Sequence, residues 1–259
     1  MNATGFSLVK WYLDCVTETG EAAILYSAQI RWRAIHLAYS SLLLAGDRGV
    51  STSATMRGAR VSRSGISIRL EAPALKLEGE WTAAGAAYEQ TMYESAEGAV
   101  HWNCLQPSAR VHLNAGGREL AGLGYAECLT VTLPPWKLPM RHLKWGRFVS
   151  EEDALAWIDW QGPHSTQLVV HNGAKGENPS ISDTEIACDG VKLCLEEPFP
   201  LRTGRVGKTI LPGAPALVKI FPKNLFNIDE RKWRSRGLLE TAERQSRGWV
   251  IHETVDWNV

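Results

Sequence analysis

The sequence predicts a mostly β protein made of antiparallel sandwiches or barrels, and three observations support this fold class. Short runs of β-branched, aromatic and apolar residues dominate the chain. Turns rich in glycine, proline, asparagine, aspartate and serine separate these runs. Helical periodicity is scarce, and no amphipathic helix of the length that a parallel β-α-β unit requires alternates with the strands. These features are typical of sandwich and barrel families.

The predicted strands follow the chain in order. The first, Phe6 to Val16, ends at the turn Thr17 to Gly20, which has turn composition. In the rest of the first half, strands are expected at residues 21–32, 36–44, 65–70, 75–81, 91–94, 99–105, 111–113 and 120–133. In the second half, they are expected at 144–150, 154–161, 166–172, 181–187, 191–196 and 248–257. One or two helical turns are expected within 211–226, where prolines prevent a long helix.

A proline-rich segment, Leu133 to Pro139, marks the expected boundary between two domains. It follows a long predicted strand near the midpoint, and its prolines stiffen the chain and cannot donate to a sheet ladder. The sequence therefore predicts an N-terminal β domain over residues 1–133 and a C-terminal β domain over residues 134–259. The other interpretation is an irregular edge inside one barrel, because 259 residues suit one large β domain or two smaller ones.

The charge balance argues against a nucleic-acid partner. The chain has 28 Lys and Arg residues against 28 Asp and Glu residues, so its formal net charge is zero. A nucleic-acid binder normally carries a basic excess or a basic stripe. The one short basic cluster, residues 231–236, is expected to be a solvated surface rather than a polyanion site.

Cysteine usage and the known motifs exclude several further classes. The chain has five cysteines, and no two of them have the spacing of a zinc site or a disulfide framework. We expect the cysteines to be small buried hydrophobic residues, and we expect no metal site and a reducing cytoplasmic setting.

The start of the chain lacks the pattern of a signal peptide, and the longest apolar stretch, Leu42 to Ala45, is too short to span a bilayer. Phosphate-binding loops and the nucleophile-elbow motif are also missing, so no nucleotide cofactor is expected.

Polar and aromatic side chains share faces on several predicted strands. Residues two apart in a strand point to the same face. The chain also contains eleven tryptophans, some of them beside charged residues. The pairs that share a face are His101 with Asn103, Tyr125 with Glu127, Trp145 with Arg147, Trp157 with Asp159, and His171 with Val169.

Two of these pairs, Tyr125 with Glu127 and Trp157 with Asp159, have apolar residues on the opposite strand face as well. Glu127 and Asp159 are therefore expected to be buried, where a carboxylate needs a partner or a raised pKa. Arg147 is a candidate partner for one of them. One interpretation is a structural arginine–carboxylate pair that holds two strands in register. The other is a cavity with an acid, a base and a cation for proton transfer.

Three motifs give the chain a family resemblance. Gly122 to Glu127, Leu143 to Phe148 and Ala156 to Trp160 resemble the central block of the hydroxyneurosporene synthase (carotenoid hydratase) and AttH-like family, and Gly248 to Glu253 resembles its last strand. The resemblance implies two lipocalin-like β-barrel or sandwich halves packed together, with a hydrophobic site in or between them. It also implies water addition to carotenoids, or cyclisation as in related Diels–Alder-type cyclases, without a metal or nucleotide.

The sequence thus predicts a cofactor-independent isomerase, cyclase or hydratase that acts on a hydrophobic unsaturated small molecule such as a terpenoid or polyene. Its acid and base groups would face an aromatic-lined cavity. The predicted catalytic residues are Glu127, His101, Tyr125 and Asp159, and the predicted substrate-binding residues are Asn103, Trp102, Trp145, Arg147, Trp157 and His171. The alternatives are a non-catalytic carrier of a lipophilic ligand and an interaction module that uses exposed tryptophans.

Overall fold

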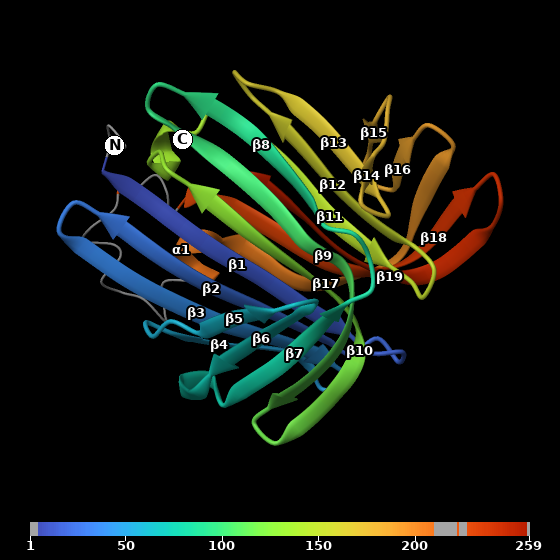
Figure 1. Cartoon of the computed structure of the whole chain (residues 1–259), viewed down its shortest axis with the longest axis horizontal. Helices are drawn as coiled ribbons and strands as arrows, with labels where there is room; N and C mark the ends of the chain where they lie inside the picture. Colours follow the sequence, from blue (N-terminus) through green and yellow to red (C-terminus); the bar gives the residue numbers. More distant parts are fainter. Residues whose placement is uncertain (1–4, 210–221, 223–226, 258–259) are drawn as a thin grey trace. The chain divides into compact units, whose positions relative to one another are not determined.

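The computed structural model of the protein describes residues 5–209, 222 and 227–257. Within these residues, the strands form one sheet of ten strands and one sheet of nine, and Figure 1 shows both. Both sheets are antiparallel and strongly curled, so the predicted mostly β fold class is confirmed. The helical turns expected within 211–226 lie outside the described residues, apart from Pro222.

The described residues fall into two compact units, which we call unit 1 and unit 2. Unit 1 contains residues 5–138, and unit 2 contains residues 139–209, 222 and 227–257. The sequence places the boundary after residue 133, whereas the units divide after residue 138, within the same proline-rich segment. A 3-10 turn at Pro135–Lys137 lies in that segment.

Unit 1 contains the ten-stranded sheet. Its strands lie in the order β4-β3-β2-β1-β10-β9-β7-β6-β5, and β8 pairs with β9. The bounds are β1 Phe6–Val16, β2 Ala22–Trp32, β3 Ile35–Gly46, β4 Gly49–Thr55, β5 Arg60–Ser64, β6 Ser67–Ala72, β7 Leu77–Ala83, β8 Tyr88–Ser95, β9 Gly98–Ala115 and β10 Arg118–Val131. A 3-10 turn, Pro73–Leu75, connects β6 to β7.

The curl of this sheet encloses an apolar core. One cluster of buried residues gathers Leu25 from β2, Leu13 from β1, Val111 from β9 and Ile68 from β6. Strands β2 and β6 are far apart in the sheet order, so a shared cluster requires the sheet to bend around it. Trp81 of β7 is a fully buried member of this cluster, and its indole Nε1 donates a hydrogen bond to the backbone carbonyl of Asp14 on β1 at 2.7 Å.

Gly124 allows β10 to approach β1 closely. A Cβ atom at this position would collide with the backbone oxygen of Asp14 and would lie 2.7 Å from Val111 Cγ2. The register between β9 and β10 shifts on both sides of Ala126, which marks a β-bulge. Bulges bend a strand and redirect its side chains, and this one lies directly beside Tyr125 and Glu127.

Unit 2 contains the nine-stranded sheet, in the order β14-β13-β12-β11-β19-β18-β17-β16-β15. The bounds are β11 His142–Val149, β12 Ala154–Gln161, β13 Thr166–His171, β14 Ala174–Lys175, β15 Ser180–Ile181, β16 Glu185–Cys188, β17 Val191–Arg205, β18 Asp229–Thr241 and β19 Gln245–Asp256. The short helix α1, Val206–Thr209, follows β17. The core of this unit gathers Phe148, Leu155, Trp157, Leu193 and Val250.

Strand β18 corrects one expectation from the sequence. The basic cluster at residues 231–236 is part of this strand and is not a uniformly solvated surface. Lys232 is fully buried and forms ion pairs with Glu253 and Glu230. Arg236 lies over the ring of Trp249, with 3.7 Å between its Cζ atom and the ring centroid. Lys232 is thus paired across the sheet with β19, whereas Arg234 and Arg236 lie over the ring of Trp249.

The five cysteines are free, and each is buried or partly buried, as the sequence predicts. Within the ranges that the structure describes, no helix has the length and apolar character needed to cross a membrane.

Candidate active site

A buried carboxylate, that of Glu127, is the centre of the candidate site. Tyr125 precedes it by two residues on β10, and the Tyr125 hydroxyl donates a hydrogen bond to Glu127 Oε2 at 2.7 Å. Trp102 on β9 donates its indole Nε1–H to the same oxygen at 2.6 Å. The exposed fractions of the three residues are 0% for Tyr125, 2% for Trp102 and 7% for Glu127. Two donors therefore hold one oxygen of a buried carboxylate.

The neighbouring strand adds a second carboxylate and a second phenol. In the register of β1 with β10, Tyr12 lies opposite Glu127, and Asp14 lies opposite Tyr125. The Tyr12 hydroxyl donates to Asp14 Oδ2 at 2.9 Å, and the rings of Tyr12 and Tyr125 meet edge to face at 6.0 Å. We call Tyr12, Asp14, Trp102, Tyr125 and Glu127 the Glu127 cluster. The sequence analysis missed Tyr12 and Asp14, although their spacing is the same signal that identified Tyr125 and Glu127.

The groups around Glu127 keep their protons at neutral pH. Burial raises the pKa of Tyr125 well above its ordinary value, and the nearby Cys104 and Glu127 raise it further. Burial likewise raises the pKa of the Cys104 thiol. On the following residue of β10, burial and the charge of Glu127 raise the pKa of Cys128 to about 11. Tyr125 is therefore a hydrogen-bond donor to Glu127 and not a competing anion.

Two predicted site residues, His101 and Asn103, point to the opposite face of β9 from Trp102. Successive side chains of a strand alternate between faces, and Trp102 occupies the face of Glu127. His101 is exposed, and its Nδ1 lies 3.0 Å from Thr91 Oγ1 on β8 in a hydrogen bond. The structure therefore does not bring His101 and Asn103 to Glu127.

The predicted residues of β11 and β12 also divide between two faces. Arg147 lies opposite Ala156 in the register of β11 with β12. Its side chain and that of Asp159 therefore point to opposite faces of the sheet. Of the two carboxylates for which the sequence made Arg147 a candidate partner, Glu127 and Asp159, the structure does not bring Asp159 to Arg147. Arg147 Nη1 donates to the Trp249 carbonyl at 2.7 Å, and Asp159 accepts a hydrogen bond from Gln161 Nε2 at 2.6 Å.

The predicted tryptophans of unit 2 have separate environments. Trp157 belongs to the apolar core, where its ring lies against Gly146. Trp145, on the Arg147 face, has the ammonium of the buried Lys232 over its ring, 5.5 Å from the centroid. The rings of Trp145 and Trp157 do not line one cavity together, because they point to opposite faces of the sheet.

His171 belongs to a structural network at one end of unit 2. Its Nε2 lies 3.1 Å from the Asp153 carboxylate, whose side chain is fully buried. Arg244 donates two hydrogen bonds to the same carboxylate, and Asn172 and Ser246 add one each. These partners, Arg244 first, hold the pKa of Asp153 well below its usual range. The network explains the position of His171 without a substrate.

Another histidine, His252 of β19, has an unusual environment that the sequence analysis did not identify. Its Nε2 lies 2.9 Å from Ser235 Oγ, and its ring stacks on Trp233 with 5.2 Å between centroids. Burial, and after it the charge of Lys232, lower the pKa of His252 to about 4. Ser235 is only 1% exposed, so this neutral histidine is a satisfied internal group and not the base of an accessible serine nucleophile.

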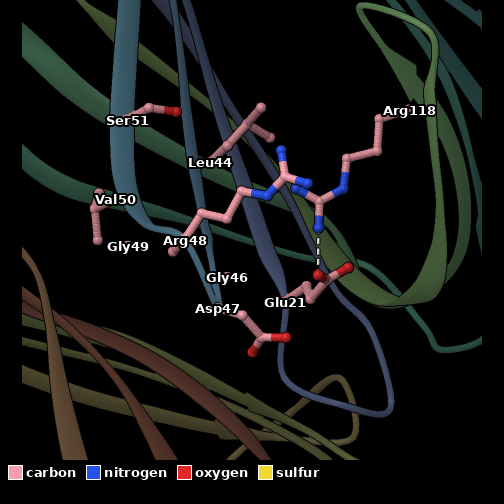
Figure 2. A pocket seen from close by; sticks show the side chains of 10 residues that line it. Glu21, Leu44, Gly46, Asp47, Arg48, Gly49, Val50, Ser51 and Arg118 are labelled. Atoms are coloured by element: carbon pink, nitrogen blue, oxygen red, sulfur yellow. Dashed lines mark hydrogen bonds and ion pairs between the residues drawn. The ribbon is translucent and has the colours of Figure 1, made fainter.

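None of the predicted site residues lines the pocket that the structure shows in unit 1, which has a volume of about 480 Å³. Figure 2 shows this pocket and the polar side chains around it. Among the described residues, no group of three or more His, Cys, Asp and Glu side chains could hold a metal ion.

Comparisons with known proteins identify the fold. No family model and no curated protein matches the sequence. A solved structure of CghA with Sch210972 is 12% identical over 96% of this chain and 88% of that chain, with a TM-score of 0.62. An AttH-like protein from Nitrosomonas europaea is 10% identical over 99% and 94%, with a TM-score of 0.60. Kievitone hydratase from Nectria haematococca is 11% identical over 100% and 91%, with a TM-score of 0.55.

At these identities the likeness shows the fold alone. The chain has the double lipocalin-like β fold that its AttH-like structural neighbour also has. The sequence resemblance implied this class of fold, and the structure confirms it.

Proposed function

We propose that this chain is a cofactor-independent enzyme that isomerises, cyclises or hydrates a hydrophobic unsaturated small molecule, with Glu127 as the group that moves the proton. The observation that carries the proposal is the carboxylate of Glu127, which is 7% exposed and has one oxygen fixed by Tyr125 and Trp102. A buried, oriented acid or base among aromatic rings is typical of a proton-transfer site.

Each residue of the Glu127 cluster has a role in this proposal. Protonated Glu127 would donate its proton to one alkene carbon, and the cation that develops on the neighbouring carbon would face the aromatic rings. In hydration, water adds to that carbon, and Asp14, held by Tyr12, would take the released proton. In isomerisation or cyclisation, Asp14 would instead take a proton from a carbon of the substrate. In each case Asp14 then releases its proton and Glu127 takes one up, which restores the starting state. Tyr125 and Trp102 keep Glu127 in place and exchange no proton with the substrate.

Two further points support the substrate class. The motifs around Glu127 resemble those of carotenoid hydratases, which suggests a terpenoid or polyene substrate. One of the solved structures with this fold is kievitone hydratase, a hydratase by its name.

The test begins with the ligand. Protein isolated from its own source is examined by native mass spectrometry for a bound lipophile, with geraniol and farnesol as additional probes. The lipophile is then incubated with the protein in D₂O. The proposal predicts a product with carbon-bound deuterium, formed at a rate proportional to protein concentration. Binding and release of the unchanged lipophile, with no deuterium on carbon, would instead identify a carrier.

A further inference from the structure

Three turns meet at one end of the unit 1 sheet and line a pocket. Glu21 lies in the loop between β1 and β2, residues 46–49 form the β3–β4 hairpin, and Arg118 begins β10. Residues from all three turns line the pocket of about 480 Å³, which Figure 2 shows. This volume is within the range of small-molecule sites, roughly 300 to 1,000 Å³.

The pocket is lined by two guanidinium groups, of Arg48 and Arg118, and by two carboxylates, of Glu21 and Asp47. Arg118 Nη2 forms an ion pair with Glu21 Oε1. The side chain of Arg48 extends into the same pocket toward Arg118, whereas the carboxylate of Asp47 points away from both (Figure 2). Among the residues that the structure describes, Arg48 has neither a hydrogen bond nor an ion pair. The guanidinium of Arg48 beside the Glu21–Arg118 pair therefore keeps its hydrogen-bond donors for a ligand.

The ion pair of Arg118 with Glu21 lies against the β3–β4 hairpin. A Cβ atom on Gly46 would lie 3.2 Å from Glu21 Oε1 and 3.5 Å from Arg118 Nη2, so the hairpin backbone packs directly against the ion pair. Leu44 lies beside the charged groups and gives the pocket an apolar side. The pocket thus combines a guanidinium in an ion pair, a guanidinium without one and an apolar surface at Leu44.

We propose that this pocket binds the oxyanion, a carboxylate or a phosphate, of a small amphiphilic molecule, with Arg48 and Arg118 as its donors. Guanidinium groups match the planar or tetrahedral geometry of such anions and form charge-assisted hydrogen bonds with them. The short apolar tail of the ligand would lie against Leu44. The proposal does not depend on the function proposed for the Glu127 cluster, because the two sets share no residue.

Isothermal titration calorimetry of the full chain tests the proposal with octanoate and octyl phosphate as anionic probes and octanol as the neutral probe. We expect saturable binding of at least one anionic probe that weakens as salt is raised, and about tenfold weaker binding of octanol. The tighter anionic probe identifies the preferred oxyanion. Equal affinity for octanol, or no binding of either anion at millimolar concentration, would overturn the proposal.

Three variants separate the site from nonspecific binding. Arg48→Gln should lower the affinity for the anionic probe by about tenfold, because it removes one charged donor. Glu21→Gln frees Arg118 from its carboxylate and should retain or strengthen binding. Arg57→Gln, beyond the other end of β4, removes an exposed charge of the same kind and should change nothing. Unchanged binding in a folded Arg48→Gln protein, checked by its thermal unfolding, would contradict the assignment.

Discussion

Tyr125 donates a hydrogen bond from its hydroxyl to Glu127 Oε2 at 2.7 Å, and the two residues lie two positions apart on β10. The alternation of a strand places both side chains on one face, where Trp102 donates to the same oxygen. The bond keeps a buried carboxylate oriented and also keeps the phenol protonated. The stability of the fold and the proposed catalysis therefore both depend on the hydrogen bond between Tyr125 and Glu127. Unfolding measurements test the first, and turnover measurements test the second.

Replacement of Tyr125 by phenylalanine should change how stability depends on alkaline pH. The pKa of Tyr125 is raised in the folded protein, whereas an unfolded tyrosine ionises near pH 10. Ionisation of the unfolded chain therefore destabilises the wild type as pH rises above about 10, and Tyr125→Phe lacks this contribution. At pH 8 the variant should be less stable by about 1 to 3 kcal/mol, because Glu127 loses a donor. Urea unfolding at pH 8 and above pH 10 measures both effects, and parallel pH profiles would contradict the assignment.

Replacement of Asp153 by asparagine should destabilise unit 2. The carboxylate is fully buried and binds Arg244, Ser246, Asn172 and His171, so the change leaves a charged partner unmatched. We expect a loss of about 3 kcal/mol in urea unfolding. The pKa of Asp153 is lowered in the fold, so its stabilisation is present above about pH 4 and is lost as pH falls. Asp47→Asn, at an exposed position, is the matched control and should be nearly neutral.

His252 should make the protein less stable in mild acid. Its pKa is about 4 in the fold and about 6.5 when unfolded, so between these values the unfolded chain binds more protons. The free energy of unfolding should therefore decrease as pH falls from about 6.5 to 4. His252→Gln should reduce this slope, whereas His101→Gln, at an exposed position, should preserve it. Chemical unfolding at several pH values decides the matter, and a wild-type slope in His252→Gln would exclude this role.

Gly146 should tolerate no side chain, because the ring of Trp157 lies directly against it. A Cβ atom at this position would overlap several ring carbons. We expect Gly146→Ala to cost about 2 kcal/mol in thermal or urea unfolding, through overpacking of the core. Gly85→Ala is the control, since its Cβ would meet nothing closer than 3.6 Å. Equal stability of the two variants would show that Trp157 moves easily and is not fixed in the core.

Part of this structure was predictable from the alternation of side chains between the two faces of a strand. The sequence predicted β1 and β12 with the bounds that the structure has, and it placed Tyr125 beside Glu127 on one face. These predictions need only the two-residue period of a strand and the turn residues at its ends. The mostly β fold class follows from the same information.

Pairing between strands made the rest unpredictable. Whether Trp102 or His101 meets Glu127 depends on the register of β9 with β10, which a bulge shifts. Asp14 joins the cluster only because β1 pairs with β10, more than 100 residues later in the chain. The charges of β18 resemble a surface in the sequence, yet Glu253 on β19 pairs with Lys232 inside the sheet. Such non-local contacts leave no trace in local composition.

The central claim is that Glu127 moves the proton, and the initial rate of the Glu127→Gln variant tests it most directly. The measurement uses the lipophile that the protein converts, in D₂O, with wild type and His101→Gln as references. Glutamine keeps the shape and the hydrogen bonds of the site but cannot carry the proton. The account predicts a loss of about 100-fold or more in kcat with a nearly unchanged KM, while His101→Gln stays close to wild type. A folded Glu127→Gln protein that turns over its substrate at the wild-type rate would contradict it.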